Sequence, residues 1–216
     1  MQFIEQSGET ADRDLQANAC AVLSGLMAVS DDIQERVLSA GVVSRARALL
    51  AEVASGEQRT LQLNALACLA EALRDREAQA EALVQEGGLE PVLSLCRPDL
   101  PARLQEAAAD VVCALACAEA SRGPLSEQGA VTKLAGLLAT ENHDVRVRAL
   151  MGLGMLLPQR GPNQVALAGD AAAVGLLLGL MRQTEDLDCR SIARDLFAGL
   201  ASNPECKDLI AAAMRA

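Results

Sequence analysis

Apolar residues recur along the chain at spacings of three and four, the spacing of one face of an α-helix. No stretch rich in Val, Ile, Tyr or Thr alternates with a period of two, so we expect no strands. The pattern therefore predicts an all-α protein, in which amphipathic helices bury their apolar faces against one another.

Five of these helical stretches share a face made of Leu and small residues, and they recur along the chain. Their equivalent positions are separated by steps of 46, 46, 38 and 44 residues: Leu23, Leu69, Leu115, Leu153 and Phe197. A glycine follows each of the first four stretches and precedes another apolar helix. These glycines are Gly41, Gly88, Gly129 and Gly169. A repeat of this length predicts a solenoid of stacked helical units.

The unit NALACLAEALRDREAQAEALVQEGGLEPVLSLC, from Asn64 to Cys96, resembles the armadillo repeat, as do DVRVRALMGLGMLL from Asp144 and QERVLSAGVVSRARALL from Gln34. The resemblance covers approximately residues 12–216. It implies a right-handed armadillo-type α-solenoid with three helices per unit, whose third helices line a concave surface that binds extended or helical partner segments. We expect a single domain over residues 1–216, with units at approximately 12–54, 55–99, 100–141, 142–183 and an incomplete 184–216.

The Leu face also predicts the core. With two Phe and no Tyr or Trp, the core has to be built from Leu, Ala and Val. We expect five leucines to be almost fully buried: Leu23, Leu69, Leu115, Leu153 and Leu200. At the helix ends, Asp32 to Glu35 reads as a capping box, and Asn203 precedes a proline at a favourable first helical position.

Charge and cysteine content limit the partners and the compartment. The chain has 19 Lys and Arg against 29 Asp and Glu, a net charge of −10, which disfavours nucleic acid and anionic lipid and favours a basic protein partner. Its longest apolar run, 171–181, is shorter than the roughly 18 residues of a membrane span. The first residues carry no signal-peptide pattern, and the seven Cys fit reduced core positions. We expect a cytoplasmic protein.

No set of residues predicts a catalytic, cofactor or metal site. His143 is the one histidine, so a Ser/His/Asp triad has a single possible member. Cys113 and Cys117 share a helical face but have no second pair of ligands nearby, as a structural zinc site requires. We therefore expect a protein that is not an enzyme, uses no cofactor and holds no metal through its cysteines.

A binding surface can be predicted from the helices that follow the glycines, which the resemblance places on the concave side. Counted from Gly41, Gly87 and Gly129, the predicted partner-binding residues are Ser44, Arg45, Arg47, Glu90, Ser94, Thr132 and Lys133. Three of them are cations on one row, so an acidic part of the partner could lie against them. The predicted function is a non-catalytic scaffold or adaptor for another protein, as a whole or as one module of a longer chain.

An alternative function is indicated by the stretch VLSGLMAVSDDIQERVLSAG from Val22 to Gly41. It is similar to the repeat of armadillo-type nucleotide-exchange factors for seventy-kilodalton heat-shock chaperones, which would make the chain a chaperone cofactor. Importin-like recognition of basic peptides is disfavoured, because the grooves with that role resemble one another in repeated Trp and this chain has none.

Overall fold

The computed structural model describes residues 10–52, 58–158, 161–182 and 185–215. Within these ranges the chain forms helices and no strand, which confirms the predicted fold class. The predicted unit boundaries at 54–55 and 183–184 lie outside the described residues, as does most of the segment considered for a leader. The helices are α2 (Thr10–Val29), α3 (Asp31–Ser39), α4 (Val42–Glu52), α5 (Arg59–Leu73), α6 (Glu77–Gln85), α7 (Leu89–Leu93), α8 (Ala102–Cys117), α9 (Glu119–Glu127), α10 (Ala130–Leu137), α11 (His143–Leu156), α12 (Gly161–Gly169), α13 (Ala171–Arg182), α14 (Leu187–Ser202) and α15 (Pro204–Ala213).

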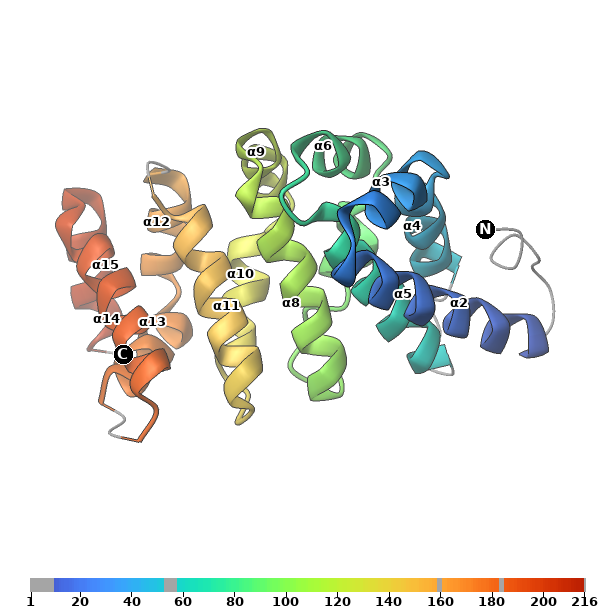
Figure 1. The fold of residues 1–216 in the computed structure, drawn as a ribbon. Coiled ribbons are helices and arrows are strands. Elements are labelled where there is room, and N and C mark those ends of the chain that lie inside the picture. The colour runs from blue at the N-terminus through green and yellow to red at the C-terminus, as the bar shows by residue number, and fades with distance from the viewer. Residues whose placement is uncertain (1–9, 53–57, 159–160, 183–184, 216) are drawn as a thin grey trace.

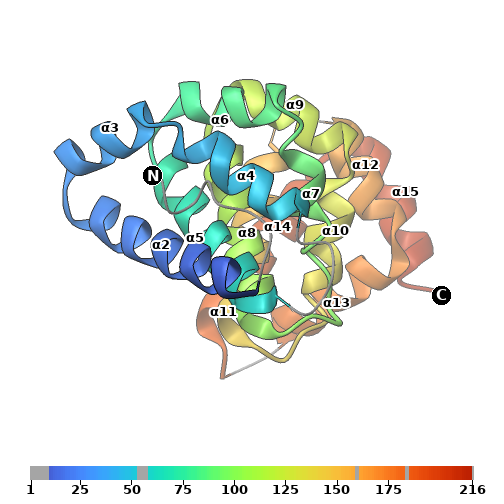
Figure 2. The same ribbon diagram turned by 90° about the vertical axis from the view of Figure 1, so that its right-hand side faces the viewer.

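These helices form three rows that run along one stack (Figures 1 and 2). The first row consists of the long helices α2, α5, α8, α11 and α14. We call the side of this row that faces away from the other two rows the long-helix face. The second row contains α3, α6, α9, α12 and α15, and it arches along the upper edge in Figure 1. The third contains α4, α7, α10 and α13. Among the described helices, only the first row has every successive pair in close contact.

Four of the five predicted core leucines are almost fully buried: Leu69, Leu115, Leu153 and Leu200. The prediction was wrong for Leu23, which is only half-buried. The reason is its place in α2, the first helix described. The next long helix, α5, packs on one side of α2, and no described helix packs on the side at the end of the stack. Three apolar residues on α2 are accordingly exposed there: Leu15, Val22 and Leu26. One repeat later, the matching positions in α5 are fully enclosed.

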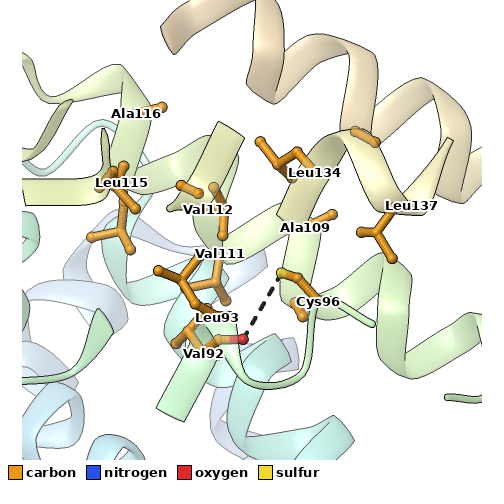
Figure 3. Packing of buried hydrophobic residues seen from close by; sticks show 14 of the residues in the cluster. Val92, Leu93, Cys96, Ala109, Val111, Val112, Leu115, Ala116, Leu134 and Leu137 are labelled. Carbon is orange, nitrogen blue, oxygen red and sulfur yellow. Dashed lines mark hydrogen bonds between the residues drawn. The ribbon is translucent and has the colours of Figure 1, made fainter. Parts of the chain in front are cut away.

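The centre of the stack shows how a core without aromatics is filled (Figure 3). Val92 and Leu93 of α7 pack with Val111 and Leu115 of α8, and all four are buried. The short α7 lies against α8 with little space between them, because branched side chains of medium size interdigitate closely. Cys96 fills a remaining gap as a small apolar residue, with Sγ 3.9 Å from the carbonyl oxygen of Val92.

Glycines close three of the turns between the second and third rows, whereas Gly169, expected in the fourth turn, is the last residue of α12 and has no left-handed φ. Gly41, Gly87 and Gly129 have φ of 79°, 75° and 77°, a left-handed conformation that other residues adopt at a cost. Gly88, which the repeat pattern singles out, is needed for a different reason. Its φ is −77°, and a Cβ there would collide with Leu83.

The helix starts follow ordinary capping chemistry. Asn203 caps α15 as predicted, since its Oδ1 accepts from the backbone N–H of Glu205 at 3.0 Å and Pro204 takes the first helical position. The predicted capping box at Asp32 is wrong by two residues. Ser30 is the N-cap of α3, and its Oγ accepts from the N–H of Ile33 at 3.4 Å.

No single described helix is both long and apolar enough to cross a membrane. The helices α12 and α13 reach that length only when they are joined, and they meet at an angle of 87°.

Candidate partner-binding surface

The long-helix face is built from aligned positions on successive helices. The repeat steps that align Leu69, Leu115 and Leu153 also align three further sets of positions. The residues in these sets are Asn64, Asp110 and Arg148; then Ala67, Cys113 and Met151; then Glu71, Cys117 and Met155. Each set runs across α5, α8 and α11, and all of these residues except the buried Cys113 are at least partly exposed, so a ligand lying across the helices would meet them in turn.

Contacts between neighbouring helices fix these side chains. The Asn64 amide donates to the carbonyl oxygen of Ala17 at 2.9 Å, which joins α5 to α2. The Arg148 guanidinium bonds Asp110 at 2.8 Å, which joins α11 to α8. Because both partners in each case lie on rigid helices, the polar groups of this face hold defined positions before any ligand binds.

Carboxylates gather at the middle of the face. Burial raises the pKa of Asp110, the Arg148 guanidinium acts against this, and the nearby carboxylates of Glu106 and Glu71 raise the pKa further. Arg74 pairs with Glu71 on the same helix. Three carboxylates thus share two guanidinium groups, which leaves this part of the face with an excess of negative charge.

Sulfur-containing side chains extend the face toward the C-terminal half. Met151 is exposed, and the sulfur of Met155 lies 4.0 Å from Sγ of Cys117. Cys113 is buried and donates to the carbonyl oxygen of Arg148 at 3.3 Å. Unbranched, polarisable methionine adapts its shape to different ligands, so this patch suits apolar side chains of varied form.

An apolar pocket of about 370 Å³ opens between α11 and α14. Its walls include Gly154, Leu157, Leu196 and Leu200, and the Asp195 carboxylate lies among them. Gly154 lets the two helices leave space here, because its missing side chain would otherwise fill part of the opening. The pocket can take one aliphatic side chain and offers a single negative charge beside it.

The residues predicted from sequence lie on α4, α7 and α10, in the third row rather than on the long helices. At the start of that row, Ser44 donates to one Glu86 carboxylate oxygen at 2.7 Å, and Arg47 donates to the other at 3.2 Å. The structure therefore brings two of the predicted residues together. Glu86, which is not among the predicted residues, neutralises the Arg47 charge and joins α4 to the end of α6.

The other predicted residues are spread along the same row. Glu90 and Ser94 line a polar depression of about 450 Å³ with Arg59, Arg97 and Asp99. Ser94 donates to the carbonyl oxygen of its own helix at Pro91, 2.8 Å away. A bidentate hydrogen bond from Arg97 lowers the pKa of Asp99.

Thr132 is exposed and Lys133 half-buried, both on α10, and Arg45 is half-buried on α4. No tight cluster joins them to Ser44 or Arg47 in the described contacts. Whether a partner binds this row stays a prediction.

The difference between the two surfaces comes from where a repeat unit is taken to begin. Counted from Leu23, the third helix of each unit is the one after the glycine, which is the third row. The packing of the helices indicates that the concave side is instead formed by the long helices. Helices on the inside of a curved stack lie nearest to one another, and the long helices form the row in which every successive pair is in close contact. The long-helix face therefore suits the concave side, while the second row arches over the outside (Figure 1).

The seven cysteines are unpaired, and all except Cys117 are buried, as predicted. Burial raises the pKa of both Cys96 and Cys113 to about 12, so these thiols are protonated and inert at neutral pH. His143 is exposed at the first position of α11, and its ring contacts a carboxylate. Its Nδ1 lies 3.1 Å from Oδ2 of Asp186.

Comparison of the folded chain with solved structures gives one consistent result. An engineered protein from a structural genomics consortium superposes with a TM-score of 0.81 at 21% identity, over 98% of this chain and 83% of that one. A designed armadillo repeat protein matches with a TM-score of 0.76 at 20% identity, over 92% of this chain and 79% of that one. The chain has the armadillo-repeat fold. The sequence itself matches no family model and no curated protein.

Another designed armadillo repeat protein, solved in complex with the peptide (KR)4, has a TM-score of 0.79 at 21% identity, over 98% of this chain and 85% of that one. At this level of identity the comparison establishes the armadillo fold and nothing about ligands. The rows of helices and the positions on them are therefore those of an armadillo solenoid, while the side chains that a partner would meet belong to this chain.

Proposed function

We propose that the chain is a non-catalytic scaffold that binds a segment of another protein along its long-helix face. The observation that carries the proposal is the aligned row of partly exposed polar and sulfur-containing side chains across α5, α8 and α11. This row leads to the pocket between α11 and α14. A face that spans several units can bury an interface of standard size even against a slender ligand.

The charges favour a basic segment. The three carboxylates around Asp110 exceed their two guanidinium partners, and Asp195 adds a further negative charge at the pocket. The net charge of −10 attracts a basic ligand from a distance. The exposed Met151 and the apolar pocket suit aliphatic side chains, so the preferred ligand combines Lys or Arg with Leu, Ile or Val. A designed armadillo repeat protein of similar fold was solved in complex with the basic peptide (KR)4, and a basic ligand for this chain agrees with that example.

The proposal can be tested by fluorescence anisotropy with two labelled peptides, one alternating Lys and Leu and one alternating Glu and Leu. The test variant is the double substitution Glu106→Lys and Asp195→Lys, which reverses two charges on the long-helix face. The matched control is Glu77→Lys and Glu127→Lys, which makes the same change of charge at exposed positions on α6 and α9.

The basic peptide is expected to bind the unchanged chain more tightly than the acidic one. The long-helix variant should lose at least tenfold in affinity, about 1.4 kcal/mol, while the control changes little because isolated exposed charges contribute little. Equal losses in both variants would show that only the overall field matters and would refute this choice of surface.

The same assay tests the row predicted from sequence. Reversal of the charges of Arg45 and Lys133 together should lower the affinity for an acidic ligand at least tenfold if the third row is the binding surface.

For the chaperone alternative, the direct measurement is stimulation of nucleotide release from a seventy-kilodalton heat-shock ATPase. We place the adaptor in the cytoplasm, where reduced thiols are the normal state.

A further inference from the structure

Three side chains of types that can ligate a metal lie close together where the fourth and fifth units join. His143 is the first residue of α11, Asp186 is the N-cap of α14, and Cys189 lies in the first turn of α14. One ligand atom from each, a ring nitrogen, a carboxylate oxygen and a sulfur, lies within 4.8 Å of the other two. These residues belong to neither the long-helix pocket nor the predicted row, and they have no part in the proposed function.

The order of the three groups argues against a catalytic triad. A nucleophilic cysteine needs the imidazole beside the thiol, where it can remove the proton. Here the Asp186 carboxylate lies between the two. The Cys189 side chain is also fully buried, so the thiol is not accessible to a substrate.

The same order suits chelation, because the carboxylate is already oriented. Its Oδ1 accepts the backbone N–H of Cys189 at 3.0 Å, so Oδ2 is left to face His143 at 3.1 Å. Ligand atoms around a tetrahedral zinc ion lie about 3.3–3.7 Å apart, as bond lengths of about 2.0–2.3 Å require. The 3.1 Å between Nδ1 of His143 and Oδ2 of Asp186 is close to these values, and Sγ of Cys189 lies within 4.8 Å of both atoms. The His143 side chain is half exposed, so small rotations of it can complete the fit.

We propose that His143, Asp186 and Cys189 form a binding site for a zinc ion. The mixed set of nitrogen, oxygen and sulfur ligands is the set that Zn²⁺ accepts, with a water molecule as the fourth ligand. Binding replaces the thiol proton of Cys189 by the metal, so the proton is released to solvent. This inference departs from the sequence analysis, which expected no metal at any cysteine.

The surrounding charges fit a cation. Asp144 on α11 and Asp188 on α14 lie near His143, and Arg146 on α11 lies near Cys189. Arg146 is tied to backbone, because its guanidinium donates to the carbonyl oxygens of Thr140 and Glu141 at 2.7 and 2.9 Å. With Asp186 the site thus has three carboxylates around it and one cation held to one side.

A bound ion would join the start of α11 to the start of α14. The fifth unit has two described helices, α14 and α15, where the four before it have three. A metal crosslink at this point would hold α14 against the rest of the solenoid. Ligand binding to the folded state alone raises stability in proportion to the logarithm of the free metal concentration.

The test uses the full chain, stripped of metal by a chelator and returned to chelator-free buffer with the thiols reduced. Isothermal titration with Zn²⁺ measures stoichiometry and affinity, and Co²⁺ reports a bound thiolate through its near-ultraviolet charge-transfer band. The variants are His143→Gln and Cys189→Ser. The matched control is Cys117→Ser, which removes the exposed thiol elsewhere on the chain.

We expect one Zn²⁺ per chain, a cobalt–thiolate band, and a rise in the midpoint of thermal unfolding on adding zinc. His143→Gln should weaken binding at least tenfold, and Cys189→Ser should abolish the cobalt band, while Cys117→Ser leaves both unchanged. His143 is exposed, so its variant keeps the test valid even if Cys189→Ser unfolds. The absence of stoichiometric binding, or an unchanged affinity in His143→Gln, would overturn the proposal, as would loss of binding in Cys117→Ser.

Discussion

Leu69→Ala and Leu23→Ala form a matched pair that tests how the stack is stabilised. Both leucines occupy the same position in the repeat. Leu69 is fully buried on α5, which packs against both α2 and α8, whereas Leu23 is half-buried on α2, which has a long helix on one side only. Removing three buried carbon groups from Leu69 costs about 2.4 kcal/mol at about 0.8 kcal/mol each. Helices on both sides prevent collapse around the cavity, which brings the expected total to about 4 kcal/mol.

Leu23→Ala should cost far less, about 1–2 kcal/mol, because part of the side chain is already in water and the open side lets the helix relax. Val29, which is 78% exposed on the same helix, provides the control, and Val29→Ala should change the free energy of unfolding by less than about 0.5 kcal/mol.

The free energies come from urea unfolding followed by far-ultraviolet circular dichroism. A repeat array can unfold from its ends, so amide exchange in α5 is measured on the same samples to separate fraying from global unfolding. Equal losses for Leu23→Ala and Leu69→Ala, or a loss below about 1 kcal/mol for Leu69→Ala, would show that the cost does not follow the number of neighbouring helices.

Three further predictions concern charge, thiols and turns. Asp110 has a pKa raised above its ordinary value of 3.8. Between that pH and the raised pKa the folded state binds more protons than the unfolded state, so this residue lowers stability as the pH rises through that range. Asp110→Asn introduces the residue found at the equivalent position, Asn64. It should remove that pH dependence without loss of stability at neutral pH, as measured by urea unfolding at several pH values. A loss of stability at neutral pH would mean that the bond to Arg148 contributes more than burial of the carboxylate costs. Titration with a thiol reagent should give one rapidly reacting cysteine, Cys117, and six that react after unfolding, and Cys117→Ser should remove the rapid phase; several rapid thiols would contradict the burial of the other six. Gly129→Ala should cost about 1–2 kcal/mol in thermal unfolding because of its φ of 77°, whereas Gly136→Ala inside α10 should stabilise by up to about 1 kcal/mol; equal effects would contradict the left-handed turn.

Much of the fold could be predicted from the sequence because a solenoid repeats its physics in every unit. One Leu position per unit marks the core, and the glycines mark the turns at Gly41, Gly87 and Gly129. The partial exposure of Leu23 could not be predicted, because burial depends on the neighbouring helix on each side and the pattern within one unit does not contain that information. The N-cap of α3 was predicted wrongly because Ser30 and Asp32 both have side chains that can cap a helix, and only the backbone geometry decides between them.

The binding surface was harder to predict because a periodic sequence fixes the period but not the point where a unit begins. Shifting that point moves the expected surface from one row of helices to another, and the residues named change completely. The row containing Ser44 and Lys133 and the face containing Asp110 and Met151 follow from the same repeat with different starting points. Packing distances between successive helices, which no single unit encodes, are what favour the second.

The period also determines which distant residues meet. Contacts between neighbouring long helices join residues about one repeat apart: Asn64 with Ala17 across 47 positions, and Arg148 with Asp110 across 38. His143 and Asp186 are 43 positions apart and meet for the same reason, since each begins a long helix. Metal ligands are usually sought at short local spacings, which excludes this pair. In a solenoid the informative separation is one repeat, and a search of the sequence at that separation would have placed the one histidine beside a carboxylate and a cysteine.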